Sequence, residues 1–273
     1  LCVNNKNYLV LKQLGEGGSS KVSQVFCLQS KTTMAVKQVS LKGADEPTKN
    51  EFKNEIEFLM KLRRNPYIVH LYDYQLTNDH IFLVLECGST DLAKLIQSRK
   101  SQNSRLEIYE IRYFWKKMLH AVNTIHQHGV IHRDLKPANF VFVEGHLKLI
   151  DFGISNSIQS DATSIIKETQ CGTLNYMAPE AIMDMSGGYN PEAPQFKISP
   201  RADVWSLGCI LYSMMYGRTP FQHIKHQMLK LNAITNPQHR IEFPEFKDQR
   251  LWKIVQNCLQ RNPKNRATVE QLL

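Results

Sequence analysis

The chain changes from strand-like to helical sequence near residues 86–91, and this change constrains the fold more than any other feature. Before it, short segments rich in β-branched and aromatic residues predict strands. After it, apolar residues recur at three- and four-residue spacing, which predicts helices. With 273 residues, the chain can bury one large core or two smaller ones. The expected strands are residues 8–14, 21–28, 32–41, 71–75 and 81–86.

One helix is expected between the third and fourth of these strands. Asp45-Glu46-Pro47 is typical of a helix start, and Asn65-Pro66 marks the end. This part of the chain is therefore predicted to be a small sheet with a single packed helix. The apolar residues that follow the helical spacing are Phe52, Ile56, Leu59 and Leu62.

A long helix and a hairpin are expected in the second part. Segments 140–143 and 147–150 meet at Glu144-Gly145, which is typical of a hairpin. Two long connections, 151–180 and 184–200, follow, and loops of this length are usually functional or mobile. The long helix ends at Gly129, and its apolar face comprises Ile111, Phe114, Trp115, Met118, Leu119, Val122 and Ile125.

These patterns predict an α+β fold with two lobes in one domain, residues 1–273. The N-lobe, residues 1–86, is expected to hold a small antiparallel sheet and one helix. Residues 87–91 are expected to form a hinge, and residues 92–273 a larger helical C-lobe. A cleft between the lobes is then the expected place for chemistry.

Composition narrows the partners and the compartment. Lys and Arg number 34 against 25 acidic residues, a net charge of +9 that favours acidic peptides, phosphate groups or polyanions, although a solvated basic surface is the plainer reading. Six scattered cysteines without a C-x-x-C pair argue against a zinc site and a disulfide framework, and they favour a reducing intracellular compartment. The apolar stretches are too short for a membrane anchor. Without an initiator Met or a leader, the chain is expected to be part of a longer protein.

Glycines near the N-terminus form the pattern Gly15-x-Gly17-x-x-Ser20-x-Val22 between two expected strands. Backbone N–H groups there could approach phosphates without Cβ interference. The alternative is an ordinary hairpin turn that needs positive φ, and the pattern alone does not decide between them.

A lysine lies inside an apolar strand, in the run Met34-Ala35-Val36-Lys37. An unpaired buried cation is costly, so Lys37 needs a partner. Glu55 borders the apolar stripe of the expected helix and is favoured over Glu51 and Glu57. In phosphoryl transfer such a lysine contacts the α- and β-phosphates, and its carboxylate partner holds it in place. The alternative is a surface ion pair of little consequence.

The most specific chemistry lies in the run from His132 to Asn139 and in Asp151-Phe152-Gly153. Asp134 would accept or orient the proton of an attacking hydroxyl, and Lys136 would neutralise charge on a γ-phosphate. Asn139 and Asp151 would hold Mg²⁺ through hard oxygen ligands. A turn-rich structural loop is the alternative. His132 lacks metal-ligand spacing to its neighbours and is expected to be a packed, hydrogen-bonded histidine.

The chain resembles eukaryotic protein kinases, because the glycine loop, Ala-x-Lys, His-Arg-Asp-Leu, Asp-Phe-Gly and Ala178-Pro179-Glu180 follow in that family's order. The resemblance covers nearly the whole chain. It implies the bilobal kinase fold with ATP held between the lobes. It also implies a buried central helix around residues 203–208 and an ion pair between Arg266 and Glu180.

The same resemblance implies which type of side chain accepts the phosphate. Asp134-Leu135-Lys136-Pro137-Ala138-Asn139 is similar to the serine/threonine form of the catalytic loop, and Thr173 in such kinases commonly bridges the catalytic aspartate and lysine. Arg133 would receive a phosphate on the segment 151–180 and order it. The candidate phosphorylation sites are Thr163, Ser164 and Thr169, with ordinary loop hydroxyls as the alternative.

A narrower resemblance is to the monopolar spindle (TTK) kinases. It rests on five runs: Gly17 to Val22, Glu86-Cys87-Gly88, Ile125 to Gly129, Lys136 to Phe140 and Gly217 to Gln222. It implies phosphorylation of serine and threonine with some tyrosine activity, self-activation in trans through the activation loop, and kinetochore proteins as partners. Ala162 departs from a second threonine there, so Thr163 is the leading site. The implied location is nucleus, kinetochore and cytoplasm, without nucleic-acid or membrane partners.

The adenine pocket is carried over from the resemblance as well. Leu85 would be the gatekeeper, and Asp91 could reach the ribose. The backbone groups of Glu86 and Gly88 would bind adenine between the side chains of Val22, Ala35 and Val141.

A pseudokinase would usually lack Lys37, Asp134 or Asp151. A small-molecule phosphotransferase would lack the long segment that ends in Ala178-Pro179-Glu180. An active protein kinase is therefore preferred to both alternatives.

Overall fold

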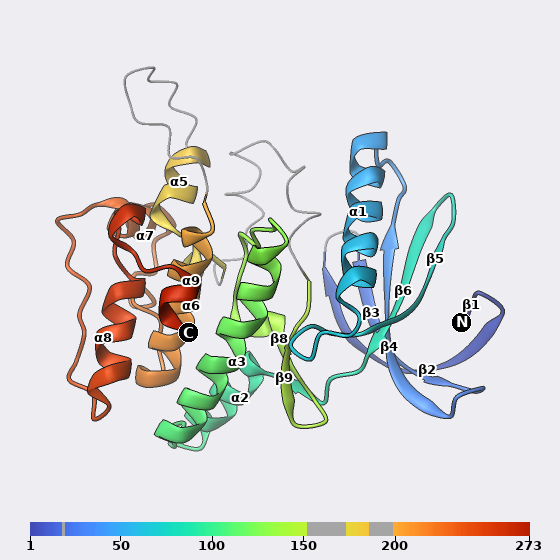
Figure 1. Cartoon of the computed structure of the whole chain (residues 1–273), viewed down its shortest axis with the longest axis horizontal. Helices are drawn as coiled ribbons and strands as arrows, with labels where there is room; N and C mark the ends of the chain where they lie inside the picture. The colour runs from blue at the N-terminus through green and yellow to red at the C-terminus, as the bar shows by residue number, and fades with distance from the viewer. Residues whose placement is uncertain (18–19, 152–172, 186–198) are drawn as a thin grey trace. The chain divides into compact units, whose positions relative to one another are not determined.

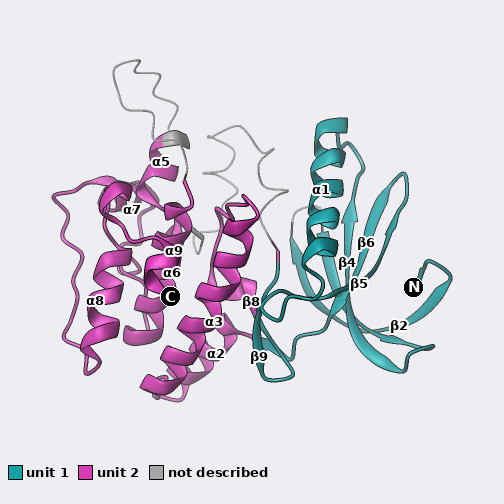
Figure 2. Ribbon diagram, viewed as in Figure 1, with its two compact units in different colours: residues 1–90, 141–150 teal, residues 91–140, 151–273 magenta. Residues whose placement is uncertain are grey.

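The computed structural model describes residues 1–17, 20–151, 173–185 and 199–273. The chain divides into two compact units (Figure 2). Unit 1 comprises residues 1–90 and 141–150, and unit 2 comprises residues 91–140 and 151–273. Unit 1 is a sheet with one helix, and unit 2 is mostly helical, so the predicted α+β class is confirmed.

Residues 141–150 lie in unit 1, whereas the sequence prediction placed them in the C-lobe. Backbone hydrogen bonds explain the difference. Val69 N donates to Leu149 O at 3.0 Å, and Ser89 N donates to Phe142 O at 2.8 Å. The predicted limits of the two lobes stay a prediction.

A six-stranded antiparallel sheet forms unit 1 in the order β1-β2-β3-β4-β6-β5 (Figure 1). Each of the five predicted strands is present, with ends shifted by a few residues. The strands are β1 (Cys2–Val3), β2 (Lys6–Gly17), β3 (Ser20–Cys27), β4 (Thr32–Ser40), β5 (Leu71–Leu76) and β6 (His80–Glu86).

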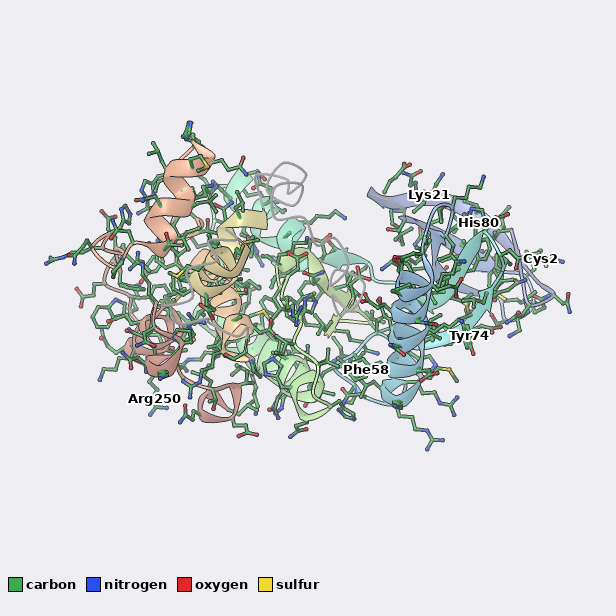
Figure 3. The ribbon with its side chains drawn as sticks, turned by 90° about the horizontal axis from the view of Figure 1, so that it is seen from above. Cys2, Lys21, Phe58, Tyr74, His80 and Arg250 are labelled. Carbon is green, nitrogen blue, oxygen red and sulfur yellow. The ribbon has the colours of Figure 1, made fainter. Side chains whose placement is uncertain are left out.

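Helix α1 (Glu46–Leu62) is the predicted helix of this unit and carries Phe58, labelled in Figure 3. Asp45 caps it, because its side chain accepts from Thr48 N at 3.0 Å, and Pro47 fits the first turn, where no N–H is needed. The helix therefore begins where the sequence predicted.

The short strand β1 was not predicted. It forms a hairpin with β2, and the turn between them reaches β5, where Asn4 Nδ2 donates to Tyr74 O at 2.8 Å. Lys6 Nζ also lies 2.9 Å from Asp73 Oδ2. Figure 3 labels Cys2 of β1 and Tyr74 of β5. The hairpin covers an apolar cluster of Val3, Tyr8, Val25, Cys27, Met34, Val36 and Val84.

Unit 2 is built around α6 (Arg201–Tyr216), which is buried from Ala202 to Met215, so the predicted central helix is confirmed. Gly208 lets α8 approach, because a Cβ there would lie 2.6 Å from Cys258 Cβ. The other helices among the described residues of unit 2 are α2 (Leu92–Ser101), α3 (Ile108–Gln127), α5 (Pro179–Met185), α7 (Gln227–Thr235), α8 (Gln249–Cys258) and α9 (Val269–Leu272).

Short elements position the motifs. The helical turns are η1 (Pro137–Asn139), η3 (Thr173–Tyr176) and η4 (Pro263–Asn265). β7 (Thr90–Asp91), β8 (Phe140–Val143) and β9 (His146–Leu149) form a second, three-stranded sheet. Glu144 and Gly145 have φ of 49° and 80°, as the predicted tight hairpin turn requires.

Candidate functional site

The loop before η1 brings two predicted catalytic side chains into contact. Lys136 Nζ donates to Asp134 Oδ2 at 2.8 Å, and both side chains are partly exposed. Among the described residues, no side chain or backbone group donates to the other carboxylate oxygen of Asp134, which can accept from a substrate hydroxyl. The sequence predicted both residues but not this direct contact.

Asn139 closes the same loop. Lys136 N donates to Asn139 Oδ1, and Asn139 N donates back to Lys136 O, both at 3.0 Å. This exchange explains the turn at Pro137 and buries the Asn139 side chain. The polar residues of the loop are therefore hydrogen-bonded, as the structural interpretation expects, and the catalytic interpretation stays a prediction.

Asp203 of α6 holds the backbone of the catalytic loop. Its two carboxylate oxygens accept from His132 N and Arg133 N, each at 2.9 Å. His126 Nε2 lies 2.7 Å from Asp203 Oδ2. Arg133 has φ of 67°, a conformation costly for a residue with a Cβ, and these bonds hold it there. The sequence placed Asp203 in a buried helix but missed its role as the anchor of the loop.

His132 is packed as predicted, with 1% of its surface exposed. Its Nδ1 accepts from Asp134 N at 3.3 Å, which orients the residue that follows Arg133. Its Nε2 has no hydrogen-bond partner within the described part of the chain. The predicted hydrogen bonding is thus present at one ring nitrogen only.

The candidate metal ligands, Asn139 and Asp151, both lie in unit 2. An amide and a carboxylate oxygen are the hard donors that Mg²⁺ prefers. Asn139 Oδ1 accepts one backbone N–H and keeps a second lone pair. Asp151 is partly buried and has φ of 54°. The chemistry of this donor pair therefore fits the ion.

Four predicted nucleotide-binding residues share one face of the unit 1 sheet. Ala35 and Lys37 are two residues apart on β4, so they point the same way. Val22 lies opposite Lys37, and Leu85 lies opposite Ala35. The other face carries Val36 and Val84, which belong to the apolar cluster under the N-terminal hairpin.

Glu55 is the buried acid of α1, with 5% of its surface exposed, whereas Glu57 is exposed and Glu51 is intermediate. A buried carboxylate needs a partner more than an exposed one does. Burial thus favours Glu55 among the three candidates for Lys37. The pair itself stays a prediction.

Gly15 and Gly17 lie on β2 rather than in a separate loop, paired with Val22 and Ser20. Neither has a positive φ. Residues 18–19, between Gly17 and its partner Ser20, lie outside the described residues, so the alternative of a hairpin turn stays open. A Cβ at either position would meet nothing within 4 Å. The space beside both glycines is therefore open, as a phosphate-binding strand requires.

The segment after β6 is held to the β8–β9 hairpin. A Cβ at Gly88 would lie 2.9 Å from Val141 Cβ, so only glycine fits this approach. Glu86 binds Lys148 Nζ through both carboxylate oxygens, at 2.8 and 2.7 Å. The sequence named Glu86 for its backbone and missed this ion pair.

Asp91 has a structural function of its own. Its Oδ1 accepts from Lys94 N at 2.9 Å and caps α2, and its Oδ2 lies 2.9 Å from Lys94 Nζ. The ribose contact stays a prediction.

Of the regulatory candidates, Thr163, Ser164 and Thr169 lie outside the described residues. The side chain of Thr173 also lies outside them, although its backbone belongs to η3.

The implied structural ion pair is confirmed. Arg266 Nη1 and Nη2 donate to the two carboxylate oxygens of Glu180 at 2.6 and 3.0 Å. Arg266 is fully buried and stacks over the ring of Trp205 at 5.3 Å. This pair joins α5 to the segment that follows η4.

The fold and the arrangement of the motif residues are those of a protein kinase, and sequence comparison agrees. The protein kinase domain family matches residues 8–273, so the chain belongs to the protein kinase family. The predicted resemblance to the monopolar spindle kinases is also confirmed. The chain is 53% identical over 274 residues to a Mus musculus protein named dual specificity protein kinase TTK, and 47% identical to the Danio rerio protein of that name.

A third relative, from Dictyostelium discoideum, is named probable serine/threonine-protein kinase mps1 and is 46% identical over 99% of this chain. The match covers all of this chain for the first two relatives. It covers 31% of the mouse protein and 27% of each of the other two, so the chain spans less than a third of their length. In the part of the chain that the structure describes, no helix is both long and apolar enough to cross a membrane.

Proposed function

We propose that the chain transfers the γ-phosphate of ATP to serine or threonine hydroxyls of proteins. The single observation that supports this best is the contact between Asp134 and Lys136 at 2.8 Å in a loop held by Asp203. One carboxylate oxygen faces a cation that can neutralise phosphate charge, and the other can take a hydroxyl proton. Catalysis would rest on positioning and electrostatics.

Unit 1 would hold the nucleotide. The apolar side chains of Val22, Ala35 and Leu85 would pack on adenine, and Lys37 on the same sheet face would contact the α- and β-phosphates. Glu55 would hold Lys37. A bound Mg²⁺ would neutralise charge on the phosphates. Asn139 and Asp151 would provide the protein oxygens that hold it.

The acceptor class rests on the catalytic loop and on the relatives. Serine/threonine specificity is supported by Lys136 and Pro137, and a dual specificity for tyrosine by the names of the mouse and zebrafish relatives. By the same relationship we propose a role in the spindle checkpoint, with kinetochore proteins as partners and a nuclear and cytoplasmic location. Self-association for phosphorylation in trans belongs to the same proposal.

Arg133 supports a phosphate switch. Its side chain is exposed and has no ion-pair partner among the described residues. A phosphate on Thr163, Ser164 or Thr169 would supply one through bidentate hydrogen bonds. Thr163 is the leading site.

One incubation tests the proposal. The protein is mixed with Mg²⁺, ATP and a peptide library of serine, threonine and tyrosine acceptors, and products are identified by mass spectrometry. We expect phosphoserine and phosphothreonine in the library and phosphate on the protein itself. Phosphate released to water without any phosphopeptide would count against protein phosphorylation, and no ATP consumption at all would count against the enzyme.

A further inference from the structure

Unit 2 contains a pocket that the proposed chemistry does not use. It has a volume of about 340 Å³ and lies between the C-terminal ends of α2 and α6 and the connection that follows α2. Three cations line it: Arg99, Lys100 and Arg105. No acidic side chain of the described residues lines it. We call this site the basic pocket.

The wall and the mouth of the basic pocket differ in character. Leu106 and Met214 are buried and, with the partly buried Ile96, supply the apolar part of its inner wall, which also includes the buried Ser213. Lys100 and Arg105 are exposed and stand at its mouth. The pocket can therefore take an apolar group inside and a negative charge outside.

The cations are only partly balanced. Arg99 Nη2 donates to Glu110 Oε1 at 2.9 Å, so its charge is paired. Neither Lys100 nor Arg105 has an ion-pair partner in the described parts of the chain. The ends of α2 and α6 each contribute about half a negative charge. Roughly one net positive charge remains, which favours an anionic occupant.

Stabilisation of a helix end does not account for all of this charge. Lys100 lies in the last turn of α2, where a cation is favoured for that reason alone. Arg105 lies four positions beyond Ser101, the last residue of the helix, and the effect of the dipole is confined to the final turn. Arg105 is therefore the residue that most clearly points to a ligand.

The size of the pocket limits the ligand. Small-molecule sites usually measure about 300 to 1,000 Å³, so this pocket accepts one or two side chains rather than a folded surface. We propose that the basic pocket docks an acidic segment of the protein substrate. An aliphatic side chain would pack on Leu106 and Met214, and flanking carboxylates would face Lys100 and Arg105. This inference rests on the proposed function, because the segment belongs to the protein that is phosphorylated.

Three peptides test the proposal. Each carries one threonine acceptor and a flexible Gly-Ser linker, followed by an acidic tail (Asp-Glu-Leu-Glu-Asp), its neutral amide counterpart (Asn-Gln-Leu-Gln-Asn) or no tail. We expect the acidic tail to lower KM about 3- to 10-fold relative to the neutral tail, as one or two exposed ion pairs allow, with kcat unchanged. Equal KM values for the two tails would overturn the proposal.

Two charge reversals locate the effect. Arg105→Glu should reduce the KM advantage of the acidic tail to less than about 2-fold. Arg250→Glu is the matched control, because it changes the net charge equally at an exposed site on α8, labelled in Figure 3. An advantage that survives Arg105→Glu would place the effect outside the pocket, and one that Arg250→Glu removes to the same extent would assign the effect to overall charge. Either result would overturn the proposal.

Cross-linking separates a failed pocket from a failed enzyme. The acidic peptide is made with a photoreactive benzophenone side chain in place of its leucine, irradiated with the protein, and the adduct is mapped by mass spectrometry. We expect adducts on Ile96 or Met214 that the neutral tail forms less often. Adducts spread over other parts of the chain would overturn the pocket proposal, whether or not the peptide is phosphorylated. The absence of phosphorylation alone would reject only the proposed function.

Discussion

The Asp134 carboxylate uses one oxygen to hold Lys136 at 2.8 Å. The second oxygen is the candidate acceptor for a hydroxyl proton, and the partial exposure of both side chains leaves room for a substrate. The backbone of the loop is held elsewhere, by Asp203. The positioning of the loop and the proposed proton transfer therefore involve different carboxylates, so mutation can test them separately.

Asp134→Asn should reduce the turnover for peptide phosphorylation about 10²- to 10⁴-fold, because the amide cannot accept the proton. ATP affinity should stay within about 2-fold, since the proposed nucleotide-binding residues of unit 1 are untouched. Initial rates and a nucleotide titration measure the two effects. Asp79→Asn, at an exposed position, is the control. Turnover of Asp134→Asn close to that of this control would reject the assigned role.

Gly88→Ala should destabilise the chain by about 1 to 3 kcal/mol, because the new Cβ would lie 2.9 Å from Val141 Cβ. Urea unfolding measures the loss. Gly15→Ala, where a Cβ meets nothing within 4 Å, should cost little.

A second substitution at the contacted residue tests the mechanism of that loss. Val141→Gly removes the clashing atom, so adding it to Gly88→Ala should cost less than it does in the wild-type chain. Additive costs would show that another contact opposes the alanine.

Among the elements of unit 2, α6 is surrounded by its neighbours and α8 lies against it at Gly208. Asp248 caps the start of helix α8, because its Oδ1 accepts from Arg250 N at 3.0 Å. Arg112 of α3 donates to the other oxygen of Asp248 at 2.6 Å. The start of α8 is therefore tied to α3 by one carboxylate.

The pKa of Asp248 is lowered: burial acts to raise it, but the Arg112 hydrogen bond and the N–H groups of Leu251 and Arg250 together outweigh burial. The charge of Asp248 therefore stabilises the fold above the unfolded pKa of about 3.9, and this contribution is lost as the pH falls toward the lowered pKa.

Asp248→Asn should cost about 1 to 2 kcal/mol at pH 7, since the amide can still cap the helix but cannot pair with Arg112. Unfolding in urea between pH 7 and pH 3 gives the difference from wild type. It should be constant above about pH 5 and shrink as the pH falls below that value. A difference that grows on acidification would contradict the sign of the pKa shift.

At the scale of the whole molecule, the Arg266–Glu180 pair joins residues 86 positions apart in the sequence. Both side chains are almost completely buried, at 0% and 2% exposure. The loss of one partner would leave the other charge without compensation in the interior. The integrity of unit 2 thus depends on a contact between distant parts of the chain.

Glu180→Ala should destabilise the chain by about 3 to 5 kcal/mol because Arg266 would remain charged and buried. Arg266→Met in the same chain should recover part of that loss, since it removes the unpaired charge. The free energy of unfolding in urea is measured for wild type, both single variants and the double variant. A double variant as unstable as the sum of the single changes would show that the pair is not coupled.

Local sequence was enough to predict the elements of unit 1, because strand composition and helix stop signals act over a few residues. Asp45 and Pro47 set the start of α1 by satisfying or removing backbone N–H groups nearby. The sequence did not predict β1, because this strand has only two residues and its pairing depends on the turn that reaches Tyr74. It also placed the β8–β9 hairpin with the helices that precede it, because long-range hydrogen bonds are not visible in composition.

The sequence by itself determined the kinase class, since the order of its motifs identifies the chemistry wherever the side chains lie. Only the tertiary structure decided which groups hold those motifs. Asp203 reaches the backbone of His132 and Arg133 across about 70 residues, and Lys148 reaches Glu86 across 62. The basic pocket likewise combines α2 with the far end of α6. The spacing of residues along the chain does not predict such contacts, because a buried or charged group in one segment finds its partner in a distant segment only after folding.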